Sequence, residues 1–150
     1  MHVEVDQSGK IEWTQKPTAL AFANGRRLSI FISAKAKREI FNELKHKRAS
    51  RSETKRHILV FATLLFLLLK EHLSQLESVV VDVEYHGHDG DIQEHFLNLC
   101  HRHRIKVPIH LLSFHLVGKK SPAHDLAIQV FRGKTKADRE ITVAEVLAEF

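Results

Sequence analysis

The chain has 150 residues, of which 43% are hydrophobic and 27% charged. These proportions exclude an intrinsically disordered protein, and the length fits a single domain spanning residues 1–150. The formal net charge of +5 favours polyanionic partners, and the single cysteine excludes an intramolecular disulfide, which fits a reducing cytoplasm.

Three segments at the start of the chain have the pattern of strands. The alternating segment His2-Val3-Glu4-Val5-Asp6 is typical of a half-buried strand, and Gln7-Ser8-Gly9 predicts a kink directly after its aspartate. Residues 18–23 and 26–33 are predicted as the second and third strands, because Asn24-Gly25 between them is a strong hairpin signal. The chain is therefore expected to open with three antiparallel strands.

Two helices are predicted next. Ser33 can cap a helix that runs to about Lys47, and Ser50-Arg51-Ser52-Glu53 has a capping-box pattern that begins a second helix ending near Leu76. The apolar run 58–69 within the second helix is shorter than the roughly 20 residues that cross a bilayer. We therefore expect a buried helix and no membrane partner.

The connection between these helices is strongly basic. Residues 35–56 hold nine Lys or Arg against three Glu. Two interpretations stay open: a solvated helix surface, or a face that follows the phosphates of DNA or RNA. The side chains assigned to nucleic-acid binding, with two more lysines from a later loop, are Lys35, Lys37, Arg38, Lys45, Lys47, Arg48, Arg51, Lys55, Arg56, Lys119 and Lys120.

A valine-rich run over residues 79–87 predicts a strand that is covered on both faces. Side chains alternate along a strand, so Val80, Asp82 and Glu84 should share one face. The two carboxylates would then lie near the carboxyl end of this strand, where they require cationic partners or a metal ion.

The rest of the chain alternates helices and strands, which predicts a mixed sheet flanked by helices. The remaining segments are a helix from Asp89 to about Arg104, a strand from Lys106 to Leu116, a helix opened by Ser121-Pro122 that ends near Arg132, a charged loop over residues 133–139, and a short helix opened by a capping box at residues 142–145.

Acidic residues from three distant segments are expected at one edge of this sheet. If the first and fourth strands are parallel neighbours, Asp6 lies beside Asp82 and Glu84, and the helix after Pro122 could bring Asp125 over the same edge. Such carboxylates repel one another without a counter-charge, and oxygen-only ligands favour Mg²⁺ or Mn²⁺. Alternatively, Asp6 forms a turn and Asp125 stabilises a helix N-terminus.

The order of these elements and acids resembles the ribonuclease H-like superfamily of nucleases. The matching pieces are Val5-Asp6-Gln7-Ser8-Gly9, Val81-Asp82-Val83-Glu84 and Ser121-Pro122-Ala123-His124-Asp125-Leu126-Ala127, the last being similar to a helix of Holliday-junction resolvases. The resemblance implies a five-stranded mixed sheet, with three antiparallel strands followed by two parallel ones and helices on both sides. It also implies hydrolysis of phosphodiester bonds with two metal ions.

Residue roles follow from the resemblance. Asp6 would bridge the metals, Asp82 or Glu84 would bind one ion and Asp125 the other, while His124 would orient the attacking water or carry a proton.

Resolvase-like action on a branched junction would require a homodimer. The alternatives are a non-catalytic nucleic-acid-binding module on the same fold, and an α/β interaction domain without a nucleic-acid role.

Overall fold

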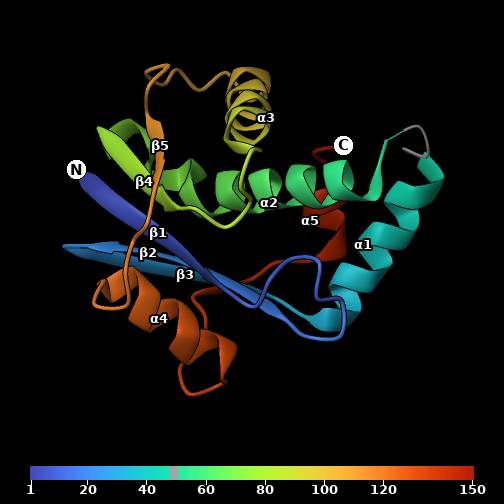
Figure 1. Ribbon diagram of the computed structural model, residues 1–150. Coiled ribbons are helices and arrows are strands. Elements are labelled where there is room, and N and C mark those ends of the chain that lie inside the picture. Colours follow the sequence, from blue (N-terminus) through green and yellow to red (C-terminus); the bar gives the residue numbers. More distant parts are fainter. Residues whose placement is uncertain (48–50) are drawn as a thin grey trace.

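The computed structural model describes residues 1–47 and 51–150, which form an α/β fold around one mixed sheet (Figure 1). The strands are β1 (His2–Ser8), β2 (Thr18–Asn24), β3 (Arg26–Ile32), β4 (Ser78–Asp82), β5 (Leu112–His115) and β6 (Arg139–Glu140). The helices are α1 (Ala34–Lys47), α2 (Glu53–Leu69), the 3-10 helix η1 (Lys70–Gln75) that continues it, α3 (Asp89–Arg102), α4 (Pro122–Phe131) and α5 (Val143–Leu147).

The sheet has the strand order β5-β4-β1-β2-β3-β6. Strands β1, β2 and β3 are antiparallel, whereas β4 and β5 run parallel to β1, and β6 runs parallel to β3. The prediction that the first and fourth strands are parallel neighbours is confirmed. This pairing brings the beginning and the middle of the chain together at one end of the sheet.

The sheet has six strands, and the expectation of five misses β6. The charged residues 139–140 pair with Ile30 and Phe31, and the backbone N–H of Ile141 donates to the carbonyl of Phe31. A strand of two charged residues carries no alternating apolar pattern, so the segment resembled a loop in sequence. Its position depends on β3, an element more than 100 residues earlier in the chain.

The first strand continues past the predicted kink. Gln7 and Ser8 still pair with β2, and the strand ends at Ser8, directly before Gly9, where φ is +79°. A Cβ atom at Gly9 would lie 2.3 Å from the carbonyl oxygen of Pro17 and 2.5 Å from the ring of Phe131. A glycine is therefore required here both for the backbone angle and for the close approach of its neighbours.

Most helix starts agree with the capping patterns. The hydroxyls of Ser33 and Ser121 accept backbone N–H groups in the first turns of α1 and α4, and Thr142 forms a full capping box with Glu145. At α2 the cap is Ser52, which accepts from the N–H of Lys55; the first serine of the predicted capping box lies outside the described residues.

The second helix is α-helical to Leu69 and continues as η1 to Gln75, close to its predicted end near Leu76. Two other predicted elements are too long. Helix α3 ends at Arg102, because the chain reverses at Arg104 with φ of +58°. The last long strand spans only residues 112–115, since the segment before it turns at Pro108, whose carbonyl accepts from the N–H of Leu111.

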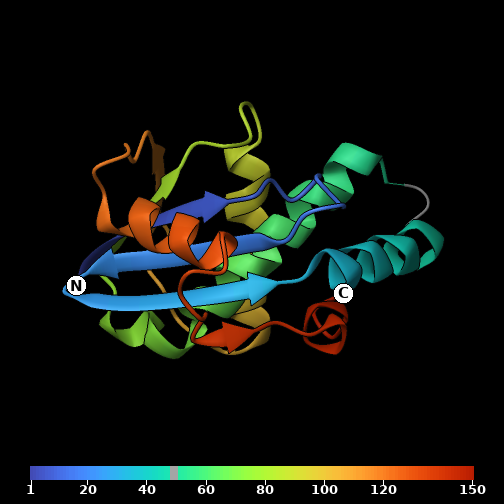
Figure 2. The same cartoon turned by 90° about the horizontal axis from the view of Figure 1, so that it is seen from below.

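Helices cover the sheet on both faces (Figures 1 and 2). The main core packs α2 and α3 against one face, where Val3 and Val5 of β1 and Val79 and Val81 of β4 are buried. On the opposite face α4 packs against β1 and β2. Because side chains alternate, the acidic residues of β1 and β4 lie on the side of α4. The α4 face is thus the polar face of these two strands near their carboxyl ends.

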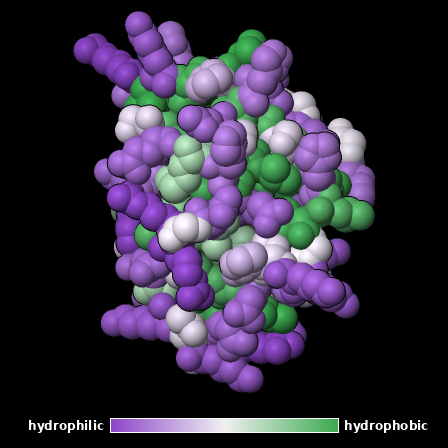
Figure 3. Space-filling view, turned by 90° about the vertical axis from the view of Figure 1, so that its left-hand side faces the viewer, coloured by the Kyte–Doolittle hydropathy of each residue, from purple (hydrophilic) through white to green (hydrophobic). Residues whose placement is uncertain are grey.

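The central helix is longer than the apolar run that predicted it. The continuous segment Glu53–Gln75 is long and apolar enough to cross a membrane by length and composition alone. However, 72% of its most apolar window is buried inside the domain, as in a core helix. Figure 3 shows many polar side chains on the side of the molecule where the N-terminus lies, with apolar side chains between them.

Candidate metal centre

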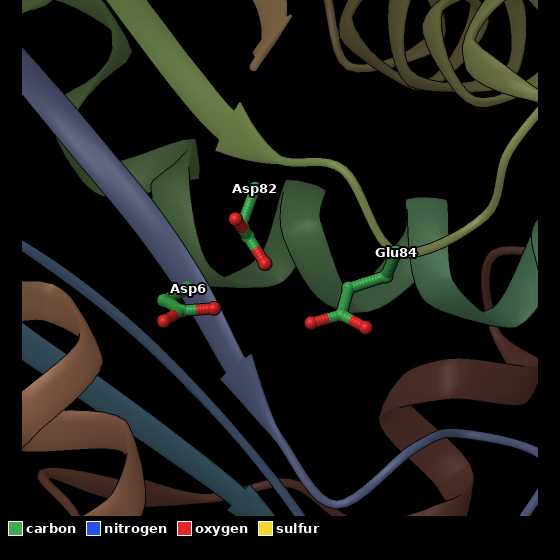
Figure 4. Close-up of side chains that lie close together, drawn as sticks. All are labelled: Asp6, Asp82 and Glu84. Carbon is green, nitrogen blue, oxygen red and sulfur yellow. The ribbon is translucent and has the colours of Figure 1, made fainter. Parts of the chain in front are cut away.

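Three carboxylates converge at the carboxyl ends of β1 and β4. Asp6, Asp82 and Glu84 each offer one oxygen, and these oxygens all lie within 4.8 Å of one another. Figure 4 shows the three side chains pointing toward a common space between the two strands. Carboxylate oxygens grouped in this way could hold a divalent cation that prefers oxygen ligands.

The parallel register of β1 and β4 explains the first two positions. Val5 lies opposite Val81, so the next residues, Asp6 and Asp82, also lie beside each other. Both point away from the valine-lined core. Glu84 lies two residues beyond the end of β4, in the connection to α3, and not on the strand face that alternation predicted. Its carboxylate nevertheless turns back toward Asp82 (Figure 4).

Hydrogen bonds fix the orientation of two of the acids. The Oδ1 atom of Asp6 accepts from the backbone N–H of Gln7 at 2.7 Å, and its Oδ2 atom lies 2.7 Å from Nδ1 of His124. The Oδ1 atom of Asp82 accepts from the backbone N–H of Val117 at 2.8 Å. Each of these contacts leaves the other lone pairs of its carboxylate for a further ligand.

Burial and like charge make this grouping electrostatically unfavourable by itself. Burial raises the pKa of Asp6, and the charge of Asp82 adds to this effect, while the Gln7 N–H and His124 oppose it. The pKa of Glu84 is raised to about 7, first by burial and then by the hydrogen bond and charge of Asp82. A bound cation would reverse these shifts, because it favours the ionised carboxylates.

Helix α4 contributes His124 to the site, whereas Asp125 is exposed and outside the group of three carboxylates. The buried residues of α4 are Ala123, Leu126, Ala127 and Val130. On a helix with this buried stripe, His124 lies at the flank and Asp125 points nearly opposite the sheet. The apolar stripe in the sequence already contained this information.

The basic residues fall into distinct environments. Lys37 is fully buried, so its assignment to a nucleic-acid surface is wrong. Lys55 forms an ion pair with Asp91 at 3.2 Å, and Arg56 donates to the carbonyl of Arg51. The assignment of Arg48 lies outside the described residues. The assigned side chains that are exposed are Lys35, Arg38, Lys45, Lys47, Arg51, Lys119 and Lys120.

Backbone donors and a tyrosine complete the surroundings of the site, and sequence patterns did not identify them. The hydroxyl of Tyr85 accepts from the N–H of Ile11 at 3.2 Å and lies 3.3 Å from the amide of Gln7. It thereby joins the segment that carries Glu84 to the segment after Asp6. In the sequence, the only indication that Tyr85 belongs to the surroundings of the site is its position directly after Glu84.

No protein-family model matches this sequence, and no curated protein matches it. The function is therefore argued from the arrangement of the residues.

Proposed function

We propose that the protein is a Mg²⁺- or Mn²⁺-dependent nuclease with a ribonuclease H-like domain. The observation that carries the proposal is the convergence of Asp6, Asp82 and Glu84 within 4.8 Å at the carboxyl ends of two parallel strands. The three antiparallel strands and the two parallel strands β4 and β5 correspond to the arrangement that the sequence resemblance implies. Strand β6 extends this sheet at one edge.

The donor set fits a hard divalent cation. Three carboxylates supply only oxygen, and burial, together with the charge of Asp82, raises the pKa of Asp6 and Glu84, a shift that a bound cation would oppose. Bound ions of this class activate a water molecule and stabilise the leaving oxygen in phosphodiester hydrolysis. In this proposal the protein positions the three carboxylates that bind the metal. His124 orients Asp6, and its imidazole is also a group that could transfer a proton.

A nucleic acid is the substrate class that suits the surface charge. Lys119 and Lys120 are exposed two and three residues after Val117, the residue whose backbone holds Asp82. Cations at this distance along the chain can contact phosphates that flank the scissile bond. DNA, RNA and branched junctions all present such phosphates. The proposed location of the protein is the cytoplasm, because the single buried cysteine suits a reducing compartment.

Labelled substrates test the proposal. Single-stranded, duplex, hybrid and four-way-junction substrates are incubated with Mg²⁺, with Mn²⁺ or with EDTA. We expect cleavage of at least one substrate with either metal and none with EDTA. Binding without cleavage across the whole panel would favour a non-catalytic nucleic-acid-binding module.

Two aspartate variants define the site. Asp6→Asn keeps the shape of the side chain but removes its charge, so it should lower kcat/KM by about 100-fold or more. Asp125→Asn is the matched control, because this carboxylate is exposed and outside the group of three. Equal losses in both variants would show that Asp125 belongs to the centre, and full activity of Asp6→Asn would reject Asp6 as a ligand.

A further inference from the structure

The loop between β1 and β2 presents an exposed aromatic side chain. Trp13 is the single tryptophan of the chain and is 48% exposed. The ammonium group of Lys10 lies 5.6 Å from the centre of its ring. An exposed indole beside a cation is the combination that proteins use to stack an unpaired base and hold its phosphate.

A buried lysine holds this loop in place. The ammonium group of Lys37 donates to the carbonyls of Trp13 at 2.8 Å and Lys10 at 3.1 Å, and to the hydroxyl of Thr18 at 2.9 Å. Arg38 in the same turn of α1 donates to the carbonyl of Thr14 at 2.8 Å. The backbone on both sides of Trp13 is therefore fixed, so the ring needs little ordering when it binds a ligand.

A basic cavity adjoins the loop. It has a volume of about 370 Å³ and lies between the loop, at Thr14, and the facing sides of α1 and α2. Arg38, Lys45 and Arg56 line it against one carboxylate, Glu53. This excess of positive charge suits a phosphate group.

The other end of the loop reaches the carboxylates. Lys10 lies close enough to Glu84 to lower the pKa of that carboxyl against the larger effect of burial. The N–H of Ile11 donates to the hydroxyl of Tyr85, the residue after Glu84. Figures 1 and 2 show the loop running from the end of β1 to the start of α1. One loop thus joins the acidic site, the exposed ring and the basic cavity.

We infer that Trp13 and the cavity lined by Arg38, Lys45 and Arg56 form a platform for a single-stranded nucleic acid. Trp13 stacks on an unpaired base, and the cavity binds a neighbouring phosphate. A duplex keeps its bases stacked on each other and cannot use the ring in this way. The inference rests on the proposed function for the meaning of the nearby carboxylates, but binding at the platform requires no metal ion.

The fluorescence of Trp13 reports directly on this platform, because no other tryptophan contributes. The protein is titrated in EDTA with an oligodeoxythymidylate or an oligouridylate of about 12 nucleotides, and with a duplex of equal length. We expect saturable quenching by one or both single strands, weakened by added salt, and much less quenching by the duplex. The stronger of the two strands identifies which of these two single-stranded probes the platform prefers.

Variants separate stacking from charge. Measured with labelled oligonucleotides, Trp13→Ala should weaken single-strand binding roughly fivefold to a hundredfold, and Trp13→Phe should restore part of the loss. Lys45→Ala should lower the affinity and reduce the salt dependence by about one counterion. Lys134→Ala, which removes an exposed cation in the loop after α4 on the opposite side of the sheet, should change neither.

Failure of this inference is distinct from failure of the nuclease proposal. Absent quenching, quenching by the duplex equal to that by single strands, or unchanged binding by Trp13→Ala would each overturn the platform, even if Mn²⁺-dependent cleavage is observed. Quenching that Trp13→Ala abolishes, in a protein that cleaves nothing, would support the platform and reject the nuclease.

Discussion

Two buried charged side chains, Asp6 of β1 and Lys37 of α1, have contrasting surroundings. Lys37 is fully buried and donates to three oxygen atoms, two of which are backbone carbonyls. Asp6 is 4% exposed and has two partners, but the carboxylates of Asp82 and Glu84 are also close to it. Burial opposes both charges, but three acceptors satisfy the ammonium group of the lysine, whereas two further carboxylates lie close to the aspartate.

The contrast separates a lysine that holds a loop from an aspartate that we propose binds a metal ion. Burial lowers the pKa of Lys37 to about 8, with partners that suit the ammonium group. At the carboxylates, burial and then like charge raise the pKa of both Asp6 and Glu84. Groups with such shifts are frequent at functional sites, which is consistent with the proposed metal centre. The following predictions test this difference, beginning with the largest effect.

Removing the lysine should destabilise the fold, while neutralising the aspartate should not. Lys37→Met leaves three acceptors without their donor, so we expect a loss of about 3 kcal/mol in the free energy of unfolding. Asp6→Asn keeps an acceptor for the Gln7 N–H and removes a repelled charge, so its stability should equal or exceed that of the wild type. Urea unfolding measures the stability of both variants. If Asp6 were the structural charge, Asp6→Asn would be less stable than Lys37→Met.

Divalent metal should stabilise the protein through the carboxylates only. At a Mn²⁺ concentration about 100 times Kd, the free energy of unfolding should rise by about 2.7 kcal/mol. The same addition should leave the stability of Asp6→Asn nearly unchanged, and Mg²⁺ should act in the same direction. Thermal unfolding with and without metal provides the measurement. An equal rise in Asp6→Asn would place the ion elsewhere.

The histidine from α4 should influence activity through Asp6. His124→Ala removes the group that lies 2.7 Å from Oδ2 of Asp6, so metal-dependent cleavage should fall about 10- to 100-fold. His124→Gln should recover part of this loss if orientation of Asp6 is the role, and none of it if proton transfer is. Rates across a pH series distinguish the two, since only a proton carrier imposes its own titration on the profile.

Glu84 should produce the smallest effect, a dependence of stability on pH. Its pKa is about 7 in the folded protein against an ordinary value of 4.5, so the folded state holds the proton more tightly than the unfolded state. The stabilisation of the folded state by the protonated Glu84 carboxyl is full below pH about 4.5 and is lost as the pH rises to about 7. Because the carboxyl is partly exposed, we expect about 1 kcal/mol. Glu84→Gln should flatten this part of the profile in metal-free buffer, and an unaltered profile would contradict the raised pKa.

Much of the fold followed from local patterns in the sequence. The Asn24-Gly25 hairpin and the caps at Ser33 and Ser121 all agree with the structure. These features depend on a few neighbouring residues, so the sequence contains them directly. Strand β6 does not follow in this way, because its two residues pair with β3, which is far from them in the sequence.

The site was predicted only in part for the same reason. The parallel pairing of β1 and β4 brought Asp6 and Asp82 together as expected, because register and alternation fix both positions. Lys37 was misassigned because its buried environment is made by a loop more than 20 residues earlier in the chain. Composition alone treats a lysine in a basic segment as exposed.

Direct binding of Mn²⁺ tests the central claim most closely. Free Mn²⁺ is measured by electron paramagnetic resonance while the metal is titrated into the wild type, Asp6→Asn and Asp125→Asn. We expect saturable loss of the free-ion signal in the wild type and in Asp125→Asn, and little or none in Asp6→Asn. Binding of Mn²⁺ to Asp6→Asn as tight as to the wild type would contradict a metal centre formed by Asp6, Asp82 and Glu84.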